Sequence, residues 1–508
     1  MKKTMKIISF KELSKIHKKY KKNGIKTILA HGVFDVLHIG HLLYFNEAKN
    51  KNRKLIVSVT SDKFVNKGDG RPVFNIKDRI RLLSSIDCVD HVVESNSPSA
   101  VKIINALKPN FYIKGKDYKN NKLDLSKNLK SEINSIKKFD GKFLVSKTKL
   151  FSSSKIIGKY DSDLLNKEMA IFFKKNVNLE NLKNKILENF SQINNSEKIL
   201  CVGDPIIDTY KYVTSLGKSA KSNILSTKKV SQKSYGGGII LVLNYLSNFI
   251  KNIDYLTYSN TKNDRVLKKF LNKKVKLIKI NSKIINIVNK IRFVDNYSKN
   301  KLFQINEGEF SDENTDKKIS KKFKSIAKKY NKILIFDFGH GFINKFLVKE
   351  INKIRKKCYI NCQSNSSNFG FNLADKYKSA YALSVDELEL RLSTRDKYNS
   401  VNNILKNNKN LVSNSKYFIV TQGDKGCYIV SKNKITFIPT LIKRSRDTTG
   451  CGDIFFSTFL ISNILKKFNI SETGIICHIA AGLHTGKEGN DNIVNSNIIC
   501  NFAKTYLN

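Results

Sequence analysis

The chain has 508 residues, of which 40% are hydrophobic, and its formal net charge is +51. At roughly 100–200 residues per domain this length is too great for one ordinary domain, so we expect two or three. There is no run of about 18 uninterrupted apolar residues and no apolar core near the basic start, so we expect neither a membrane span nor a signal peptide. The eight cysteines form no CxxC pair, which predicts a reducing, cytoplasmic setting and no disulfide framework.

The positive charge comes from lysines that are spread evenly along the chain. No arginine-rich block and no basic-aromatic motif accompanies them, although a nucleic-acid-binding protein would also be strongly basic. We therefore interpret the lysines as solvated faces suited to small anionic substrates, and we expect no nucleic-acid partner. Nucleic-acid binding stays open as an alternative that rests on charge alone and that a steep salt dependence would reveal.

Short apolar runs alternate with helical patterns in the first part of the chain. This alternation is typical of a parallel sheet with helices on both faces, that is, an α/β fold. The runs predict strands over residues 26–32, 54–62, 90–94, 109–115 and 141–147, and helices over 39–51, 75–86 and 97–108.

A second α/β series follows a stretch of different character. Residues 161–196 have a helical period and no strand pattern, so we expect a helical linker between domains 1–160 and 197–508. The later series predicts strands over residues 198–210, 332–341, 357–363, 379–385, 416–426 and 426–431.

The stretch HGVFDVLHIGH, residues 31–41, gathers three histidines and two glycines where a strand ends and a helix begins. A metal site, a phosphate site and a helix start with incidental histidines are the three interpretations. The free N–H groups and the dipole of a helix N-terminus attract an anion, and His38 and His41 share one helical face. The stretch lacks the glutamate of a zinc HExxH motif, so the pattern favours phosphate.

Four further segments accompany this stretch in a fixed order: VSVTSD, NKGDGRPVFNIKDRIRLLSSIDCVDHVV, KPNFYIKGKDY and FSSSKII. Together they resemble the HxGH nucleotidyltransferases of the cytidylyltransferase-like branch, over residues 26 to about 160. The resemblance implies a Rossmann-like domain that transfers a nucleotidyl group from ATP or CTP to a substrate phosphate, with Mg²⁺ and release of pyrophosphate. It implies that His38 and His41 are catalytic. The nucleotide-binding residues it implies are Gly32, Phe34, Asp35, Lys67, Lys114, Asp117, Ser153 and Ser154.

The second half of the chain contains RDTTGCGDIFFSTFL, residues 446–460. A Gly-x-Gly turn before a helix presents several N–H groups to an anion. Asp453, just past the turn, could accept a proton from a substrate hydroxyl while those groups hold a transferring phosphoryl group. An ordinary N-terminal aspartate after a glycine turn is the alternative.

This segment resembles the DTxGAGD signature of ribokinase-type carbohydrate kinases, with Cys451 in place of the alanine. VGDPIIDTY, GGGIILVLN, KIRFVD, FDFGHG, VTQGDKG and AAGLHTGKEG extend the resemblance over residues 198 to about 505. It implies a ribokinase-like α/β domain that uses ATP, with Asp453 as the catalytic base and Glu387 acting indirectly on Mg²⁺. The anion hole and ATP site it implies comprise Gly450, Cys451, Gly452, Thr421, Gly423 and Gly426. The sugar-binding residues it implies are Asp204, Asp208, Gly237, Gly238, Asn244 and Arg292.

The two resemblances together predict a bifunctional sugar-activating enzyme, similar to the bacterial heptose kinase/adenylyltransferases but with the domain order reversed. Such an enzyme would phosphorylate a heptose-like sugar and load a nucleotide onto a sugar phosphate for surface glycans. Its partners would be small molecules, and because kinases of this type commonly pair, a homodimer is implied. Ser384 stands where the kinases often have asparagine. This favours one alternative, an active transferase, for example of the glycerol-3-phosphate type, fused to a weak, sugar-sensing kinase-like domain.

Overall fold

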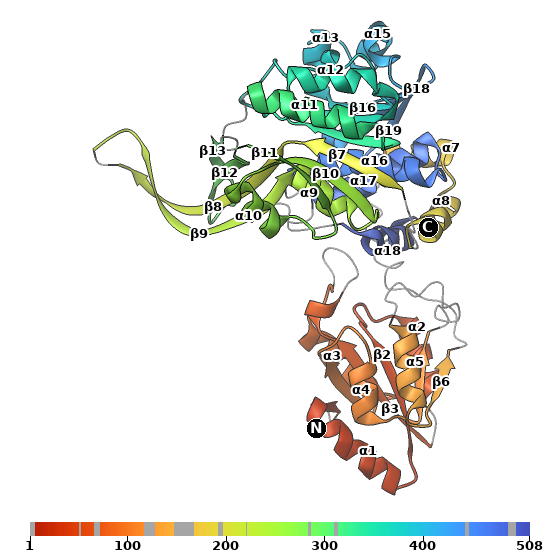
Figure 1. Ribbon diagram of the computed structural model, residues 1–508. Coiled ribbons are helices and arrows are strands. Elements are labelled where there is room, and N and C mark those ends of the chain that lie inside the picture. The colour runs from red at the N-terminus through yellow and green to blue at the C-terminus, as the bar shows by residue number, and fades with distance from the viewer. Residues whose placement is uncertain are drawn as a thin grey trace. The chain divides into compact units, whose positions relative to one another are not determined.

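The computed structural model forms two compact units, residues 1–162 with 500–508 and residues 163–499 (Figure 1). Each unit is described by itself below. The structure describes residues 6–49, 52–65, 72–115, 128–146, 167–191, 197–219, 221–282, 286–308, 313–441, 447–485 and 494–507.

The first unit is built on a six-stranded parallel sheet in the order β1-β4-β3-β2-β5-β6. Its strands are β1 (Ile7–Ile8), β2 (Lys26–Gly32), β3 (Arg53–Thr60), β4 (His91–Ser95), β5 (Phe111–Lys114) and β6 (Lys142–Val145). Its helices are α1 (Leu13–Lys22), α2 (Ile39–Ala48), α3 (Ile76–Ser84), α4 (Val101–Leu107) and α5 (Leu129–Lys137). Strand and helix alternate along the chain, and the predicted parallel α/β fold is confirmed.

Residues of β2 show why helices cover both faces of this sheet. Successive side chains of a strand point to opposite faces. Ile28 packs in one apolar cluster with Phe45 of α2, whereas Leu29 packs in another with Ile104 of α4 and Ile136 of α5. A strand buried on both faces reads as a continuous apolar run, which is the pattern that predicted it.

The second unit contains a nine-stranded sheet in the order β11-β10-β7-β14-β15-β16-β17-β18-β19. All of its strands through β17 are parallel, and β17, β18 and β19 form antiparallel pairs. The strands are β7 (Lys198–Gly203), β10 (Asn252–Ser259), β11 (Lys276–Asn281), β14 (Lys332–Asp337), β15 (Cys358–Cys362), β16 (Ala382–Asp386), β17 (Tyr417–Thr421), β18 (Gly426–Ser431) and β19 (Lys434–Pro439).

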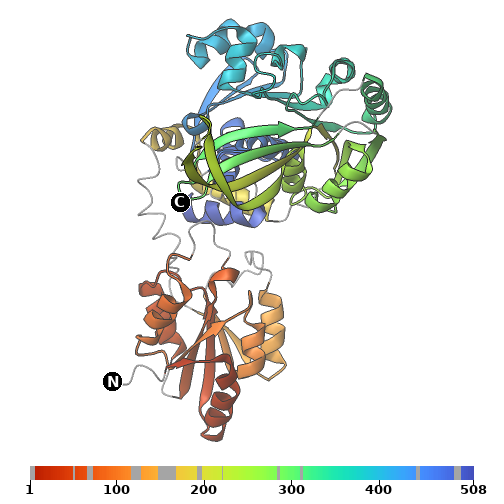
Figure 2. The same cartoon turned by 90° about the vertical axis from the view of Figure 1, so that its left-hand side faces the viewer.

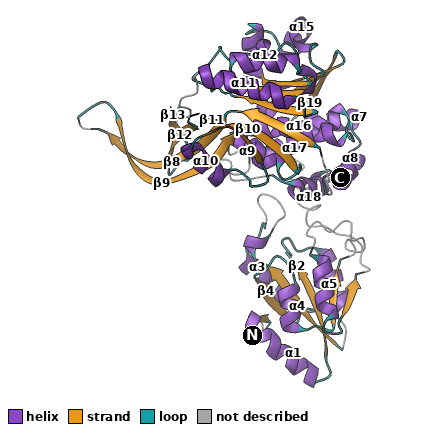
Figure 3. Cartoon of the chain, viewed as in Figure 1, coloured by secondary structure: helices purple, strands orange, loops and turns teal. Residues whose placement is uncertain are grey.

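Helices flank this sheet (Figure 3). They are α9 (Ile239–Leu246), α10 (Thr261–Phe270), α11 (Glu313–Ala327), α12 (Lys345–Lys353), α13 (Glu387–Thr394), α14 (Val401–Asn407), α15 (Lys409–Val412), α16 (Cys451–Leu465) and α17 (Ile470–His484); α18 (Ser496–Tyr506) crosses the division between the units. α17 begins with a capping box, in which the side chain of Asn469 accepts from the amide of Glu472 and Glu472 returns the bond.

A second, four-stranded sheet belongs to the same unit, in the order β13-β12-β8-β9. Its strands are β8 (Pro205–Lys218), β9 (Leu225–Gly238), β12 (Val288–Asp295) and β13 (Lys301–Glu307). The far end of the β8–β9 hairpin extends away from the body of the unit in Figure 1, and in Figure 2 the hairpin points toward the viewer. The stretch 198–210, predicted as one strand, is therefore two strands in different sheets, because the chain turns at Asp204.

The predicted linker contains α7 (Lys167–Asn176) and α8 (Leu179–Phe190). Leu182, Ile186 and Phe190 of α8 are buried, and the ring of Phe190 packs 5.9 Å from that of Phe468. α8 therefore packs against the second unit as an integral helix. In the described part of the chain, no helix is both long enough and apolar enough to cross a membrane.

Candidate active sites in the two units

The loop that follows β2 lies where the strand order of the first unit reverses. β2 is paired with β3 on one side and with β5 on the other, and ligands of open α/β sheets bind at such a switch point, beyond the carboxyl ends of the strands. His38 is the extended N-cap of α2. Its ring stacks on that of His41, with centroids 3.9 Å apart. Both predicted histidines thus meet at one helix N-terminus.

The backbone of this loop takes an unusual course at Phe34, whose φ of 48° is left-handed. This course brings its buried ring against His41, with centroids 5.4 Å apart. A Cβ at Gly32 would lie 3.1 Å from the same ring, so glycine leaves room for it. Phe34 therefore packs beneath the histidine pair, and its predicted role as a nucleotide-binding residue stays a proposal.

Asp35 and Arg79 bind the backbone of Val73 and Phe74 to the loop that follows β2. The buried carboxylate of Asp35 accepts the amides of Val73 at 2.6 Å and Phe74 at 3.2 Å. The fully buried Arg79 donates to the carbonyl oxygens of Val33 and Phe74 and pairs with Asp62. Sequence reasoning treated this arginine only as part of a matching segment, although an arginine on the apolar face of a helix is a signal for a buried anchor.

Lys114 ends β5, beside the end of β2. Its ammonium group donates to the carbonyl oxygen of His31 at 3.4 Å and lies 3.6 Å from Glu132. His31 itself is buried against Ser58, at 2.9 Å, and burial holds its pKa well below the usual value. His31 is thus a structural residue, as its place on the strand suggested. Lys67, Asp117, Ser153 and Ser154 lie outside the described residues.

Asp453 lies in the first turn of α16, which Gly450 opens in a left-handed conformation with φ of 80°. The first N–H groups of a helix have no partner within it, so this turn presents donors to an anion beside the carboxylate. The oxygen Oδ1 of Asp453 accepts the side-chain amides of Gln363, at 2.7 Å, and Asn361, at 3.2 Å. Oδ2 accepts no hydrogen bond from the described residues.

Burial raises the pKa of Asp453 to about 7, although the hydrogen bonds from Gln363 and Asn361 oppose the shift. A carboxylate with a pKa near neutrality is well matched to general-base chemistry. Gln363 and Asn361 were not predicted. Their position could have indicated them, because both are polar and lie within or directly after the apolar strand β15, at its carboxyl end.

Asp447 links the loop before α16 to the four-stranded sheet. Its carboxylate accepts the hydroxyl of Tyr210 on β8 at 2.9 Å, the ammonium group of Lys301 on β13 at 3.0 Å and the amide of Thr449 at 3.1 Å. Burial alone would raise the pKa of Asp447, but the bonds from Thr449 and Lys301 outweigh it and hold the pKa well below its usual range. This residue, too, was missed.

Asp208 and Arg292 form a buried ion pair on the neighbouring strands β8 and β12. A Cβ at Gly237 would lie 1.9 Å from a carboxylate oxygen of Asp208, so any other residue there would have to displace that carboxylate. Lys290 lies on the same strand as Arg292, and the pKa of Lys290 is lowered by burial while Asp208, Asp204 and Asp453 act against that shift. The structure thus brings the predicted sugar-binding pair close to the catalytic candidate.

Two predicted sugar-binding residues bond to the protein backbone, and their role toward a sugar stays a prediction. Both oxygens of the fully buried Asp204 accept backbone amides, those of Phe338 at 3.1 Å and Phe342 at 2.9 Å, so its carboxylate shapes the loop after β14. Asn244 lies in the second turn of α9, where its side chain bonds to the backbone of Phe270 and Asn272, each at 2.8 Å. In both residues, polar atoms of the side chain already bond to backbone groups of other segments. Gly238, with φ of 53°, begins α9.

The predicted ATP turn connects β17 to β18. Gly423 and Gly426 both have left-handed φ values, 57° and 129°, and a Cβ at Gly426 would lie 2.3 Å from the carbonyl oxygen of Ile438. Thr421 ends β17 at the same edge of the sheet. The glycines therefore allow a tight turn that another residue type would distort.

The predicted Mg²⁺ residue is engaged by protein groups. Glu387 accepts Arg391 at 2.7 Å through one oxygen and Gln422 at 2.7 Å through the other. The hydrogen bonds from Gln422 and Arg391 lower the pKa of Glu387. Within the described ranges, no three His, Cys, Asp or Glu side chains are grouped so that they could hold a metal ion. A direct ligand role does not fit Glu387.

Comparisons with known proteins match the two parts of the chain to two different families. Residues 29–159 match the cytidylyltransferase-like family, and residues 196–496 match the pfkB family of carbohydrate kinases. "Bifunctional protein HldE" of Helicobacter pylori strain J99 is 41% identical over 110 residues, 21% of this chain and 24% of that protein. Its namesake in Sulfurimonas denitrificans is 34% identical over 160 residues, 31% of each chain. The alignments thus span less than a third of these relatives' length.

Among solved structures, ribokinase from Thermotoga maritima is similar to 61% of this chain, over 99% of its own length, with a TM-score of 0.48 and 18% identity. Phosphofructokinase-2 from Escherichia coli, also 99% covered, has the same TM-score and 14% identity. Because the kinase match alone spans more than half of the 508 residues, the chain belongs to the pfkB family of carbohydrate kinases, and it carries a cytidylyltransferase-like domain before the kinase domain.

Proposed function

We propose that the chain is a bifunctional sugar-activating enzyme. Its second unit would phosphorylate a heptose-like sugar with ATP, and its first unit would transfer a nucleotidyl group from ATP or CTP to a sugar phosphate. The observation that carries the proposal is the buried carboxylate of Asp453, held by Gln363 at the N-terminus of α16. Relatives named "Bifunctional protein HldE" support a pair of activities in one chain.

In the kinase step, Asp453 accepts the proton of a sugar hydroxyl through Oδ2. The hydroxyl oxygen bonds to the γ-phosphorus of ATP, the bond from that phosphorus to the bridging oxygen breaks, and ADP leaves. The amides of Gly450 and Gly452 at the start of α16 hold the charge on the transferring group, whereas the amide of Cys451 already donates to the carbonyl oxygen of Thr448 at 3.2 Å. Asp208 and Arg292 orient the sugar by accepting from and donating to its other hydroxyls.

In the transferase step, a phosphate oxygen of the sugar phosphate attacks the α-phosphorus of the nucleoside triphosphate, and pyrophosphate leaves. The N-terminus of α2 and the stacked rings of His38 and His41 favour the triphosphate charge at that point. Lys114, at the neighbouring strand end, supports this loop through the carbonyl oxygen of His31 and is paired with Glu132.

Mg²⁺ would arrive with the nucleotide phosphates, whose charge it neutralises. Since the oxygens of Glu387 already accept from Arg391 and Gln422, any effect of Glu387 on the ion is indirect, and no step above depends on it.

The exposed apolar side chains of the four-stranded sheet support a homodimer. They are Leu216, Ile224, Leu225, Val230, Leu302, Phe303 and Ile305. Exposed apolar side chains concentrated on one sheet favour an interaction site there. A Phe303→Lys variant that stays dimeric by light scattering would contradict this placement.

Mass spectrometry of products tests the function directly. The full chain is mixed with sugars or sugar phosphates and each nucleoside triphosphate, and we expect a phosphorylated sugar and a nucleotide sugar. Asp453→Asn should lose only the first product. If the wild type and Asp453→Asn are equally inert on a broad sugar panel while the transferase works, the kinase-like unit is instead a sugar sensor. Ser384, buried on β16 where these kinases often have asparagine, is the observation that favours this second reading.

A further inference from the structure

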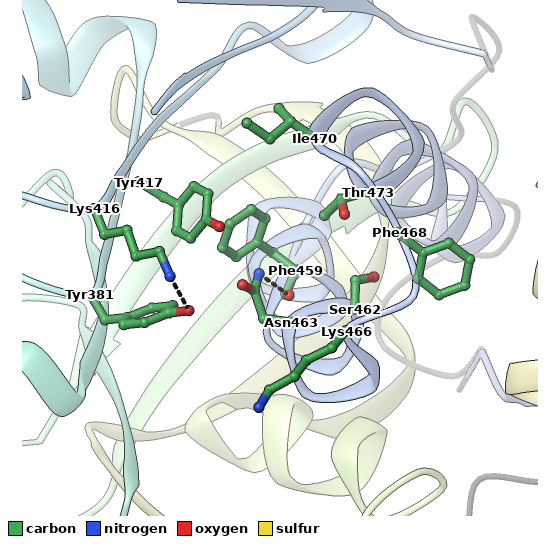
Figure 4. Close-up of a pocket in the computed structure, with 10 residues that line it drawn as sticks. All are labelled: Tyr381, Lys416, Tyr417, Phe459, Ser462, Asn463, Lys466, Phe468, Ile470 and Thr473. Atoms are coloured by element: carbon green, nitrogen blue, oxygen red, sulfur yellow. Dashed lines mark hydrogen bonds between the residues drawn. The ribbon is translucent and has the colours of Figure 1, made fainter. Parts of the chain in front are cut away.

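A cavity of about 260 Å³ opens at the edge of the nine-stranded sheet where β16 and β17 begin. The catalytic candidates lie beyond the opposite, carboxyl edge. Ten residues line the cavity (Figure 4): Tyr381, Lys416, Tyr417, Phe459, Ser462, Asn463, Lys466, Phe468, Ile470 and Thr473. Nothing in the two proposed reactions uses them.

The charge of this cavity is one-sided. Lys416 and Lys466 are exposed, and none of the ten lining residues is acidic. Glu472, the acidic neighbour of Thr473, is buried and engaged by Lys185 of α8 at 2.8 Å. In Figure 4 both ammonium groups lie on the Tyr381 side of the cavity. An anion on this side of the cavity lies near two lysine ammonium groups, and no lining residue has a carboxylate that would repel it.

The polar and aromatic walls suit a hydroxylated ring. Ser462 is 2% exposed, and its buried hydroxyl oxygen has no hydrogen-bond partner among the described residues. Such a buried group costs free energy until a partner reaches it. The rings of Tyr417 and Phe459 lie 5.3 Å apart on one wall, and Phe468 lies at the far end from the lysines. Apolar ring faces can pack against the C–H face of a sugar.

The volume limits the size of the ligand. Sites for drug-sized ligands occupy about 300–1,000 Å³, so a cavity of 260 Å³ suits a ligand as small as a monosaccharide phosphate. We propose that this cavity is a second ligand site that binds a small sugar monophosphate, with its phosphate at Lys416 and Lys466 and its ring against Tyr417 and Phe459. The choice of a sugar phosphate rests on the proposed function, whereas the preference for an anion does not.

Two helices connect this site to the rest of the unit. α16 carries Asp453 in its first turn and Ser462 near its end, about 14 Å apart at 1.5 Å per residue. α8 supports the opposite wall, because Phe190 packs on Phe468 and Lys185 pairs with Glu472. A bound ligand would therefore touch the helix of the catalytic base and a residue that anchors α8.

Calorimetry with glucose 6-phosphate on the full chain tests the site. The double variant Lys416→Ala/Lys466→Ala should bind the probe about tenfold or more weakly, as expected when charge-assisted hydrogen bonds are lost. Lys467→Ala, which removes an exposed neighbour outside the lining, should bind like the wild type. Equal affinity in wild type and double variant, or equal losses in the double variant and the control, would overturn the proposal. So would the absence of binding to the wild type at millimolar probe.

Lysine footprinting locates the ligand independently of affinity. Acetic anhydride labelling followed by mass spectrometry should show that glucose 6-phosphate protects Lys416 and Lys466 but leaves Lys467 labelled. If inorganic phosphate protects these lysines as well as glucose 6-phosphate does, the cavity binds any small anion, and the proposal that it binds a sugar is overturned. The two proposals fail separately. Phosphorylation by the wild type without protection of Lys416 and Lys466 would reject this site alone, whereas phosphorylation retained in Asp453→Asn, with protection intact, would reject the catalytic base alone.

Discussion

The side-chain amide of Gln363 donates to the carboxylate of Asp453 at 2.7 Å and joins the end of β15 to the first turn of α16. The two residues are ninety positions apart in the chain. The bond fixes Oδ1 of the carboxylate and leaves Oδ2 for the substrate. It also opposes the rise in the pKa of Asp453 that burial causes.

Gln363→Ala should therefore move the pH–rate profile of sugar phosphorylation to higher pH. Without the donor, the ionised carboxylate loses stabilisation, so its pKa rises further above 7 and less base is present at neutral pH. The measurement is kcat/KM against pH for both proteins. Asn361→Ala should act in the same direction, since its bond is also to Oδ1. A lower rate with an unmoved profile would indicate a merely structural role.

For the wild type, phosphorylation should increase as the pH rises through about 7, where Asp453 ionises. Asp453→Asn should lower kcat by about 10²–10⁴-fold, the usual contribution of a general base. The pKa of Asp453 is higher in the folded state than in the unfolded state. Burying the ionised carboxylate therefore costs folding free energy, and this cost is present at high pH, where the carboxylate is ionised. Thermal melting at pH 8 should therefore show Asp453→Asn to be no less stable than the wild type. A large loss of Tm would contradict this assignment.

His38→Ala should abolish pyrophosphate release that depends on nucleoside triphosphate, by about 10²–10³-fold, and leave sugar phosphorylation intact. The reason is local: the stacked pair of His38 and His41 belongs to α2 alone. His17→Ala, in helix α1, is a matched control that removes an imidazole outside the site. Loss of both activities in His38→Ala would mean that the units are structurally coupled.

Gly237→Ala should raise the KM for the sugar, because the added Cβ would lie 1.9 Å from a carboxylate oxygen of Asp208 and must displace it from Arg292. If the effect runs through that carboxylate, Gly237→Ala should add little in an Asp208→Ala background. The measurement is a double-mutant cycle on kcat/KM. Fully additive losses would show that Gly237 acts on something other than Asp208.

Much of the fold was predictable because β2 and the other buried parallel strands are continuous apolar runs between amphipathic helices. The four-stranded sheet was not. β13 has an exposed pattern throughout, and β8 continues from β7 after the single turn at Asp204, so neither produces a separate apolar run. Helix α1 was overlooked because its lysines hide the apolar face around Leu13.

By itself the sequence determined the local chemistry: the glycine turns, the histidine pair at a helix start and the aspartate after the Gly-x-Gly turn. These depend on neighbours within a few residues, which propensity and spacing describe. Only the tertiary structure decided which polar side chains bond to other protein groups and which are left for a ligand. In the fold, the side chains of Asp204 and Asn244 bond to a backbone amide and a backbone carbonyl, and Gln363 bonds to Asp453. Such partners come from distant segments, and a buried polar atom takes whichever partner packing places within reach.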